Sequence, residues 1–133
     1  MLVIALAALA QLPAPYLVSP AGPYRTVTAA LAAAPAGATI RVAAGRYREP
    51  TIIIDRQVSL VGDSGAVLDG GGDHAIVIVR GYGVTIRGLE FVNTGMSYRE
   101  DRAAVRVADA GRCTIDHNRF TGTFFAIYLA RAT

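Results

Sequence analysis

Apart from Met1, four side chains of this sequence are of the types that bind soft transition metals: His74, Met96, Cys113 and His117. Met96 lies in NTGMSYREDR (93–102), a segment that interrupts the regular pattern of the chain, and such loops often carry binding sites. His74 and His117 fall at turns, and Cys113 occupies a core position of a strand, where a free thiol behaves as a small hydrophobic group. The candidate metal ligands are therefore Met96, His74 and His117, with turn and loop structure as the alternative explanation.

The acidic residues are expected in turns: Asp63, Asp69, Asp73, Asp101, Asp109 and Asp116. Glycoside hydrolysis needs two carboxyl groups facing each other across roughly 5–9.5 Å, and nothing in this spacing brings a pair together. Asp69 and Asp73 flank the glycine turn DGGGD and could approach a calcium ion, although turn chemistry explains both equally well. The sequence therefore predicts a non-enzymatic protein with no catalytic residues.

An aromatic residue beside a hydrogen-bond donor is a further candidate surface for a ligand or partner. Four first-strand positions are expected to point outward: Ile53, Val77, Arg106 and Tyr128. Among these, Arg106 and Tyr128 would lie side by side and could support a sugar ring. The alternative is the ordinary variety of a protein surface.

Short apolar strands recur in a fixed order from residue 51 to residue 129, three to each repeat. The first strands of the successive repeats are TIII (51–54), AIVIV (75–79), AAVRV (103–107) and AIYL (126–129). Taking Ile52, Ile76, Val105 and Ile127 as equivalent gives separations of 24, 29 and 22 residues. Such a period, with three strands in each repeat, is typical of a coil whose turns stack on one another.

Alternation within the strands predicts which side chains fill the coil. The inward pairs of the first strand are expected to be Ile52/Ile54, Ile76/Ile78, Val105/Val107 and Ile127/Leu129. The second strand contributes Val58, Val84 and Cys113, spaced by 26 and 29 residues, and the third contributes Leu68, Phe91 and Phe120. Asn118 is expected at the bend between the second and third strands, where the backbone is expected to adopt the left-handed conformation that asparagine tolerates.

The predicted fold is all-β: a right-handed parallel β-helix of about four turns, incomplete, with a short N-terminal capping helix. The helix is expected within TVTAALAAA (26–34), which is rich in alanine and ends at Pro35-Ala36-Gly37. Residues 21–133 would form the N-terminal part of the β-helix domain. Residues 1–20 would be a signal peptide or an apolar leader, too short for a transmembrane anchor, which predicts export.

Composition agrees with a single small domain of stacked aliphatic columns, because 53% of the 133 residues are hydrophobic and 17% are charged. The net charge of +3 comes from arginines scattered along the chain, without lysine, so a nucleic-acid-binding surface is not expected. One cysteine excludes an internal disulfide.

From about Ala21 onward the chain resembles the opening of NosD-type periplasmic proteins. The likeness rests on PAGATIRVAAGRYRE, IDRQVSLVGDSGAVLDGGG, VTIRGLEFVNTG and CTIDHNRFTGTFFAIYL, in that order. The resemblance implies a copper-binding β-helix protein of the pectin-lyase-like group, associated with an ABC transporter and with maturation of nitrous oxide reductase. The alternative, which the AGRY and VGD turns also favour, is a β-helix protein that binds or cleaves polysaccharide.

The final strand is expected to be an uncovered edge, since AIYL begins a repeat near the last residue given. Uncovered strand edges pair with other chains. End-to-end pairing or aggregation is therefore predicted for this polypeptide, together with the interpretation that it is a fragment of a longer β-helix.

Overall fold

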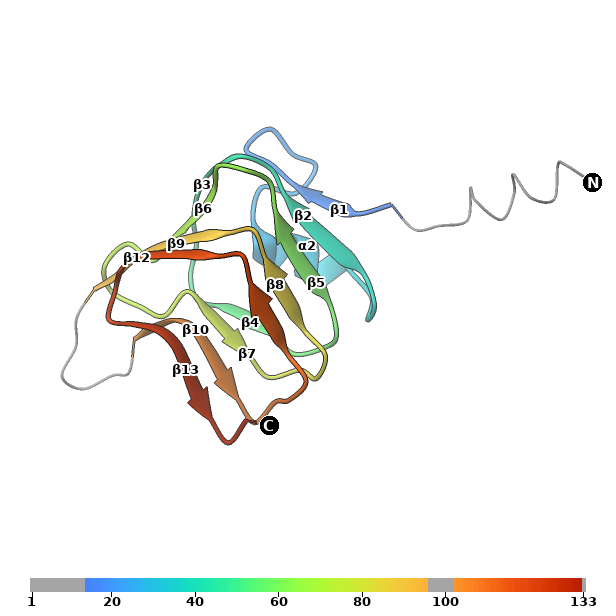
Figure 1. Ribbon diagram of the computed structural model, residues 1–133. Helices are drawn as coiled ribbons and strands as arrows, with labels where there is room; N and C mark the ends of the chain where they lie inside the picture. The colour runs from blue at the N-terminus through green and yellow to red at the C-terminus, as the bar shows by residue number, and fades with distance from the viewer. Residues whose placement is uncertain (1–13, 96–101, 133) are drawn as a thin grey trace, which may run out of the picture.

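A computed structural model describes residues 14–95 and 102–132 as a coil of short strands with one helix (Figure 1). In chain order, the elements are β1 (Tyr16–Val18), α2 (Val27–Ala33), β2 (Thr39–Val42), β3 (Gly45–Arg48), β4 (Ile52–Ile54), β5 (Ser59–Gly62), β6 (Ala66–Asp69), β7 (Val77–Val79), β8 (Thr85–Arg87), β9 (Glu90–Gly95), β10 (Ala103–Ala108), β11 (Thr114–Asp116), β12 (Arg119–Thr123) and β13 (Phe125–Ala130).

The strands form three parallel sheets, one for each side of the coil. Sheet A has the order β1-β2-β5-β8-β11, sheet B the order β12-β9-β6-β3, and sheet C the order β13-β10-β7-β4. Each strand pairs with the strand one coil away, so the chain passes through sheet A five times and through the other two sheets four times. The predicted parallel β-helix is confirmed, with one more pass than the sequence indicated.

Columns of equivalent side chains fill the interior. In sheet A, Ile40, Leu60 and Ile86 lie in register and are fully buried. In sheet B, Leu68 pairs with Phe91, and Phe91 stacks on Phe120 with ring centroids 5.3 Å apart. Each such aliphatic side chain contributes roughly 1.5–3 kcal/mol on burial, which makes these columns the main source of stability.

The predicted register of β7 was wrong by one residue. Val77, not Ile76, pairs with Ile52 and with Val105, and Ile78 therefore lies in the outward column beside Ile53. Val77 is fully buried, whereas Ile78 is only half-buried. Because side chains alternate between faces, a slip of one residue exchanges the inward and outward sets of the whole strand.

The bend between sheets A and B also differs in detail from the prediction. The left-handed residue is His117, with φ of 54°, and its equivalent one coil earlier is Gly88, with φ of 75°. Asn118 contributes through its side chain instead. Its amide oxygen accepts from Leu89 N–H at 3.0 Å, and its amide nitrogen donates to the Ile86 carbonyl at 3.0 Å. The side chain of Asn118 therefore links two successive coils at the corner.

Helix α2 covers the first coils, as predicted. Thr26 caps its start by accepting from Ala29 N–H at 3.1 Å, and the helix stops before Pro35. Its apolar face, Val27, Ala30 and Leu31, is buried in the same core as the strand columns. The helix thus closes the interior of the coil at the end where the strands begin.

Glu49 and Arg56 fasten α2 to the coil at its two ends. Glu49 accepts from Val27 N–H at 2.9 Å and from Thr28 N–H at 3.0 Å. Arg56 donates to the Ala34 carbonyl at 3.1 Å and also to the Leu31 carbonyl. The coil side chains thus satisfy backbone groups that a helix leaves unpaired at its ends.

The described fold begins earlier than residue 21. Strand β1, at residues 16–18, pairs in parallel with β2 and belongs to sheet A, although the sequence placed this segment in the leader. Residues 1–13 lie outside the described residues, so the predicted leader stays a prediction. Within the described ranges, the chain forms no helix with the length and apolar character of a membrane span.

Candidate functional site

The two histidines predicted as metal ligands lie at opposite ends of the strands of sheet B. His74 follows β6, and its Nδ1 lies 2.7 Å from the carbonyl oxygen of Ala75, to which it can donate. His117 precedes β12, is 77% exposed, and has its Nδ1 3.4 Å from Oδ2 of Asp116. The fold therefore keeps these two imidazoles apart.

The remaining soft side chains do not complete a metal site with them. Met96 lies outside the described residues. Cys113 packs half-buried against the core, as predicted, with its sulfur 3.4 Å from the Gly111 carbonyl oxygen. Among the residues that the structure describes, no three His, Cys, Asp or Glu side chains are grouped to hold a metal ion. Copper binding by Met96, His74 and His117 therefore stays a prediction.

Arg106 and Tyr128 lie side by side on β10 and β13, as the repeat predicted. The Arg106 guanidinium carbon is 5.4 Å from the centroid of the Tyr128 ring, a cation–π contact. Phe125 packs against Tyr128 with centroids 5.6 Å apart, and Phe124 packs against Phe125 at 4.8 Å. One face of the tyrosine ring is thus occupied by Arg106, and a role of this pair in ligand binding stays a prediction.

Several carboxylates form ion pairs with arginines one coil away. The pairs are Arg41–Asp63 (2.9 Å), Arg46–Asp69 (2.8 Å), Arg87–Asp116 (2.7 Å) and Arg131–Asp109 (2.5 Å). The hydrogen bond from Arg87 lowers the pKa of Asp116, and the one from Arg131 lowers the pKa of Asp109. Asp109 and Asp116 are therefore ionised at neutral pH and hold no proton to donate, so they are poorly suited to general acid catalysis.

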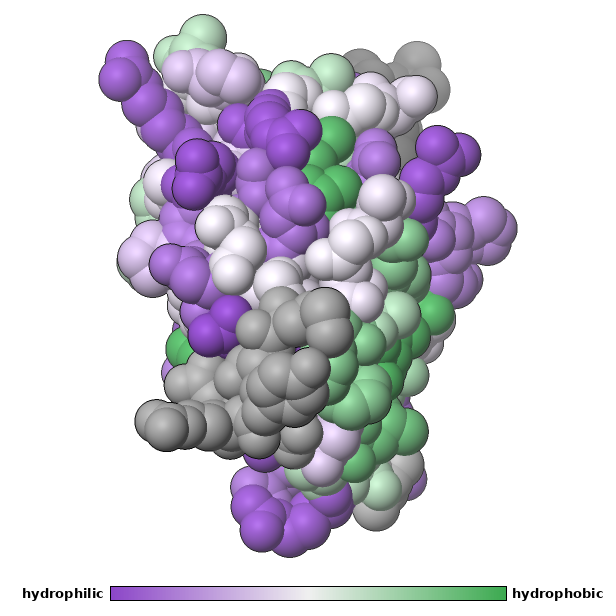
Figure 2. All heavy atoms as spheres, turned by 90° about the vertical axis from the view of Figure 1, so that its left-hand side faces the viewer, coloured by the Kyte–Doolittle hydropathy of each residue, from purple (hydrophilic) through white to green (hydrophobic). Residues whose placement is uncertain are grey.

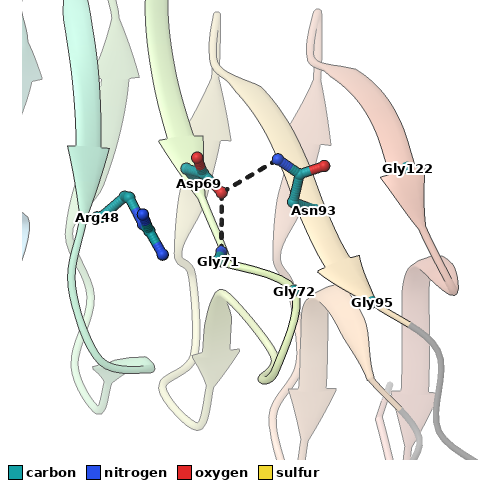
Figure 3. A pocket seen from close by; sticks show the side chains of 7 residues that line it. All are labelled: Arg48, Asp69, Gly71, Gly72, Asn93, Gly95 and Gly122. Atoms are coloured by element: carbon teal, nitrogen blue, oxygen red, sulfur yellow. Dashed lines mark hydrogen bonds between the residues drawn. The ribbon is translucent and has the colours of Figure 1, made fainter.

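The most distinctive polar site is a shallow hollow at the carboxyl ends of the sheet B strands, which we call the glycine basin (Figure 3). Its volume is about 290 Å³, and its lining residues are Arg48, Asp69, Gly71, Gly72, Asn93, Gly95 and Gly122. These residues come from β3, β6, β9 and β12 or from the turn after β6, so the basin crosses four successive coils.

Asp69 forms the fixed wall of the glycine basin. It is 7% exposed, and its two oxygens accept from Arg46 Nε at 2.8 Å, from Gly71 N–H at 2.8 Å and from Asn93 Nδ2 at 3.4 Å. Burial alone would raise the pKa of this carboxyl, but the hydrogen bonds from Gly71, Arg46 and Asn93 outweigh burial and lower it. Asp69 is therefore held in place as a carboxylate whose negative charge is balanced by Arg46.

The floor of the glycine basin is bare backbone. A Cβ atom on Gly95 would stand 2.1 Å from the carbonyl oxygen of Gly72, so no larger residue fits there without a shift. Gly95 also has φ of 73°, in the left-handed region that favours glycine. A Cβ on Gly71 would lie 2.8 Å from Nη2 of Arg48, which places the exposed Arg48 guanidinium over this turn.

Sequence reasoning considered DGGGD as a turn or a possible calcium site, and it missed the glycine basin. The basin is created by register across coils, in which Arg48 pairs with Asp69 and Asp69 with Val92. A signal was nevertheless present, because glycines follow the third strand in repeat after repeat. Oδ1 of Asp69 accepts from Gly71 N–H and Asn93 Nδ2, and Oδ2 accepts from Arg46 Nε, so the turn and the neighbouring coils account for this carboxylate, and the suggested calcium site stays a prediction.

A family match covers the first coils. Residues 18–74 match a β-helix family described as "Protein of unknown function (DUF1565)". The chain is also 35% identical over 89 residues to the "Probable ABC transporter binding protein NosD" of Pseudomonas aeruginosa. That match covers 66% of this chain and 21% of the relative, so the chain spans about a fifth of the relative's length. No solved structure matches the chain.

These similarities agree with the architecture. The family match extends from the end of β1 to His74, through the coils that build sheets A and B. The parallel coil and the family match agree on a β-helix, and over 89 residues the sequence is similar to NosD.

Proposed function

We propose that this chain is a non-enzymatic, exported module of a NosD-like accessory protein that acts with an ABC transporter in the maturation of nitrous oxide reductase. The observation that carries the proposal is the 35% identity over 89 residues to a protein whose name assigns it to ABC transporter binding. The finer role, delivery of copper to the reductase, comes from the resemblance of the sequence motifs.

The chemistry of the surface supports a binding role. The outward column of sheet C consists of Ile53, Ile78, Arg106 and Tyr128, without a carboxylate. The outward hydroxyl column of sheet A consists of Thr39, Ser59, Thr85 and Thr114. Carboxylates nearby, such as Asp63 and Asp116, are paired with arginines. These two sheet faces therefore present side chains suited to contact with a partner, and they do not present the pair of carboxyl groups that acid–base catalysis uses.

The rigidity of the coil supports the same role. Strands β2 and β5 to β10 each pair with a parallel strand on both sides, so their outward side chains keep a spacing of about 4.8 Å from one coil to the next. A partner protein can therefore recognise a pattern of side chains on a surface that loses little conformational entropy on binding.

A chimera tests the proposed role. The 89-residue segment of the Pseudomonas aeruginosa relative would be replaced by the matching segment of this chain, and nitrous oxide reduction would be measured in cells that lack the native protein. We expect the chimera to restore activity. A matched chimera that carries Leu60→Asp should fail, because Leu60 is fully buried in the sheet A column. A folded, exported chimera without activity would contradict the proposal.

Copper is the cargo that the resemblance implies, and it is tested separately. Cuprous ion would be titrated into the full chain and into Met96→Ala, His74→Ala and His117→Ala variants. Copper binding that Met96→Ala abolishes would support a direct role of this chain in copper delivery. No binding by any of these proteins would restrict its role to contacts with other proteins.

Export is tested with a reporter. Residues 1–20 would be fused to an alkaline phosphatase that becomes active only after export. We expect activity with the native leader and its loss when Ile4 and Leu6 are changed to aspartate, because these substitutions interrupt the apolar run.

A further inference from the structure

The outward face of sheet C carries a largely apolar ridge. Its central column, which we call the sheet C column, has one residue from each strand in register: Ile53, Ile78, Arg106 and Tyr128. Ile53 is 41% exposed, and the other three are half-buried. In the next outward row Ala108 pairs with Ala130, so small side chains lie beside the bulky ones. The column is therefore accessible across four neighbouring strands (Figure 1).

The other two faces of the coil are polar at the equivalent positions. Beside its hydroxyl column, sheet A has an outward column of Arg41, Val61, Arg87 and Asp116. In sheet B, Glu90 lies beside Arg119 in register. Covering polar groups of this kind costs free energy unless each one finds a new hydrogen-bond partner, whereas covering apolar groups is favourable. Sheet C is therefore the face that gains most from being covered by a partner.

Two arginines give this face a positive charge. The Arg106 guanidinium contacts the Tyr128 ring, with its carbon 5.4 Å from the ring centroid, and it forms no hydrogen bond or ion pair with a described residue. The guanidinium of Arg80, an exposed residue that directly follows β7, has no such bond or ion pair within the described ranges either. Both groups can therefore pair with carboxylates that a partner supplies.

The carboxylates at the ends of the sheet C strands already have partners in the chain. Asp55, after β4, pairs with Arg56 at 2.7 Å, and Asp109, after β10, pairs with Arg131. The hydrogen bond from Arg131 lowers the pKa of Asp109, and the nearby charge of Arg80 adds to this effect. These two ion pairs are neutral, so the charges of Arg80 and Arg106 leave this face positive and complementary to an acidic partner.

The spacing of the sheet C column fits an α-helix laid across the strands. Neighbouring strands are about 4.8 Å apart, so the four positions of the column span roughly 14 Å. An α-helix rises about 5.4 Å per turn, so about three turns cover this span with an apolar side chain near each strand. An extended segment on the same face would leave its backbone groups unpaired, because the face of a sheet offers no backbone partners. A helix is therefore the better occupant.

We propose that the sheet C column is the docking face for an acidic amphipathic α-helix of a partner protein. The apolar stripe of that helix covers Ile53, Ile78 and Tyr128, and its carboxylates pair with Arg106 and Arg80. This inference rests on the proposed function, in which the chain acts through contact with other proteins, and it adds where the contact lies and which chemistry the partner presents. An anionic membrane is the competing occupant of an apolar face with arginines, and the test separates the two.

The test is a titration of the full chain into a fluorescently labelled peptide, followed by anisotropy at low protein concentration. The probe is a synthetic helical peptide about four turns long, with leucines along one face and glutamates beside them. A second peptide carries lysine in place of each glutamate. We expect the glutamate peptide to bind, more weakly as salt is added, and the lysine peptide to bind roughly tenfold more weakly. No binding of the glutamate peptide, or equal binding of both peptides, would overturn the proposal.

Matched variants locate the docking face. Arg106→Glu should weaken binding of the glutamate peptide by roughly tenfold and strengthen binding of the lysine peptide, because it reverses a charge at the centre of the face. Ile53→Ala should weaken binding of both peptides by roughly fivefold, because it removes apolar contact. The controls are Arg119→Glu, at an exposed position of sheet B, and Val61→Ala, at a half-buried outward position of sheet A. Controls that weaken binding as much as their counterparts, or an Arg106→Glu variant with unchanged preference, would overturn the assignment.

Vesicles test the competing occupant. The full chain would be sedimented with vesicles of phosphatidylcholine alone and of phosphatidylcholine with phosphatidylglycerol. Binding to the anionic vesicles that Arg106→Glu abolishes, without binding of the glutamate peptide, would assign the face to a membrane and overturn the proposal. The peptide titration is independent of the chimera experiment, so an active chimera without peptide binding would overturn only the docking face. Peptide binding with an inactive chimera would contradict only the proposed role.

Discussion

The bend between sheets A and B shows how a residue can look functional for a conformational reason. Gly88 and His117 occupy the same place in successive coils and both have positive φ, 75° and 54°. A left-handed backbone costs roughly 1–2 kcal/mol for most residues and nothing extra for glycine. The conformation of the bend thus accounts for an exposed histidine at position 117 without a metal.

Substitution of His117 tests this explanation. We expect His117→Gly to leave the free energy of unfolding unchanged or slightly raised, and His117→Val to lower it by roughly 1–2 kcal/mol, because a β-branched residue is disfavoured at positive φ. Thermal unfolding followed by circular dichroism gives the comparison. Equal stability of the two variants would show that the backbone does not decide the residue at this bend.

Asp69 predicts a specific pH dependence of stability. Its pKa is lower in the folded chain than in the unfolded chain, where it is about 4, so folding favours the ionised form. This stabilisation is fully present above pH 4 and is lost as the pH falls through the folded pKa. We expect Asp69→Asn to be less stable than the wild type at pH 7, by roughly 1–2 kcal/mol, and the difference to shrink below pH 4.

Urea unfolding at a series of pH values measures this effect. Asp73→Asn is the matched control, because its carboxylate belongs to the same turn and is 77% exposed. We expect the control to follow the wild type at every pH. A stability difference for Asp69→Asn that stays constant from pH 7 to pH 3 would be inconsistent with an ionised Asp69 as its source.

At the scale of the element, β7 provides the sharpest test of register. Val77 is fully buried and Ile78 is half-buried on the outward face. We expect Val77→Ala to lower the free energy of unfolding by roughly 2 kcal/mol and Ile78→Ala to lower it by less than about 1 kcal/mol. Chemical denaturation of the two variants measures these losses. A larger loss of unfolding free energy for Ile78→Ala than for Val77→Ala would favour the register predicted from the sequence.

The contrast between β7 and the sheet A strands explains what the sequence could and could not predict. The sheet A columns were predicted correctly because polar Ser59, Thr85 and Thr114 mark the outward face. AIVIV at 75–79 contains no polar residue, so either alternation is equally apolar, and only pairing with β4 and β10 selects one. The glycine basin escaped prediction for a related reason, since its residues meet only through cross-coil register.

Helix α2 depends on two side chains from the coil that sequence pattern did not indicate. Glu49 accepts from the first backbone N–H groups of the helix, and Arg56 donates to its last carbonyls. We expect Glu49→Ala to destabilise α2 by roughly 1–2 kcal/mol, which would appear as faster hydrogen exchange of the α2 amides. Exchange in β8, several coils away, should be unchanged, and uniform acceleration of both would argue against a local clamp.

At the scale of the whole molecule, burial of the columns is uneven. Leu60 and Ile86 are fully buried in the middle coils, whereas Ile127 is 41% exposed and Leu129 is 66% exposed in β13. Each coil is covered by the coil on either side, so a strand with one neighbour leaves half of its inward surface open. Figure 2 shows apolar residues gathered along one side of the molecule, beside polar and charged ones.

This uneven burial predicts self-association of the 133-residue polypeptide. Strand β13 is an edge of sheet C, and Phe125, Ile127 and Leu129 leave apolar surface open beside its unpaired backbone groups. We expect the average mass measured by light scattering to rise with protein concentration. The double variant Ile127→Lys/Leu129→Lys should suppress this rise, because charged side chains at an edge oppose strand pairing.

The control for this experiment is Tyr82→Lys, which changes a 61% exposed aromatic residue in the turn between β7 and β8, away from that edge strand. It should associate as the wild type does. Suppression by Tyr82→Lys would point to general surface hydrophobicity, and a wild type that stays monomeric at high concentration would contradict the prediction. If association depends on Ile127 and Leu129 alone, the same aliphatic columns that fill the coil also mediate contact between two copies of the chain at strand β13.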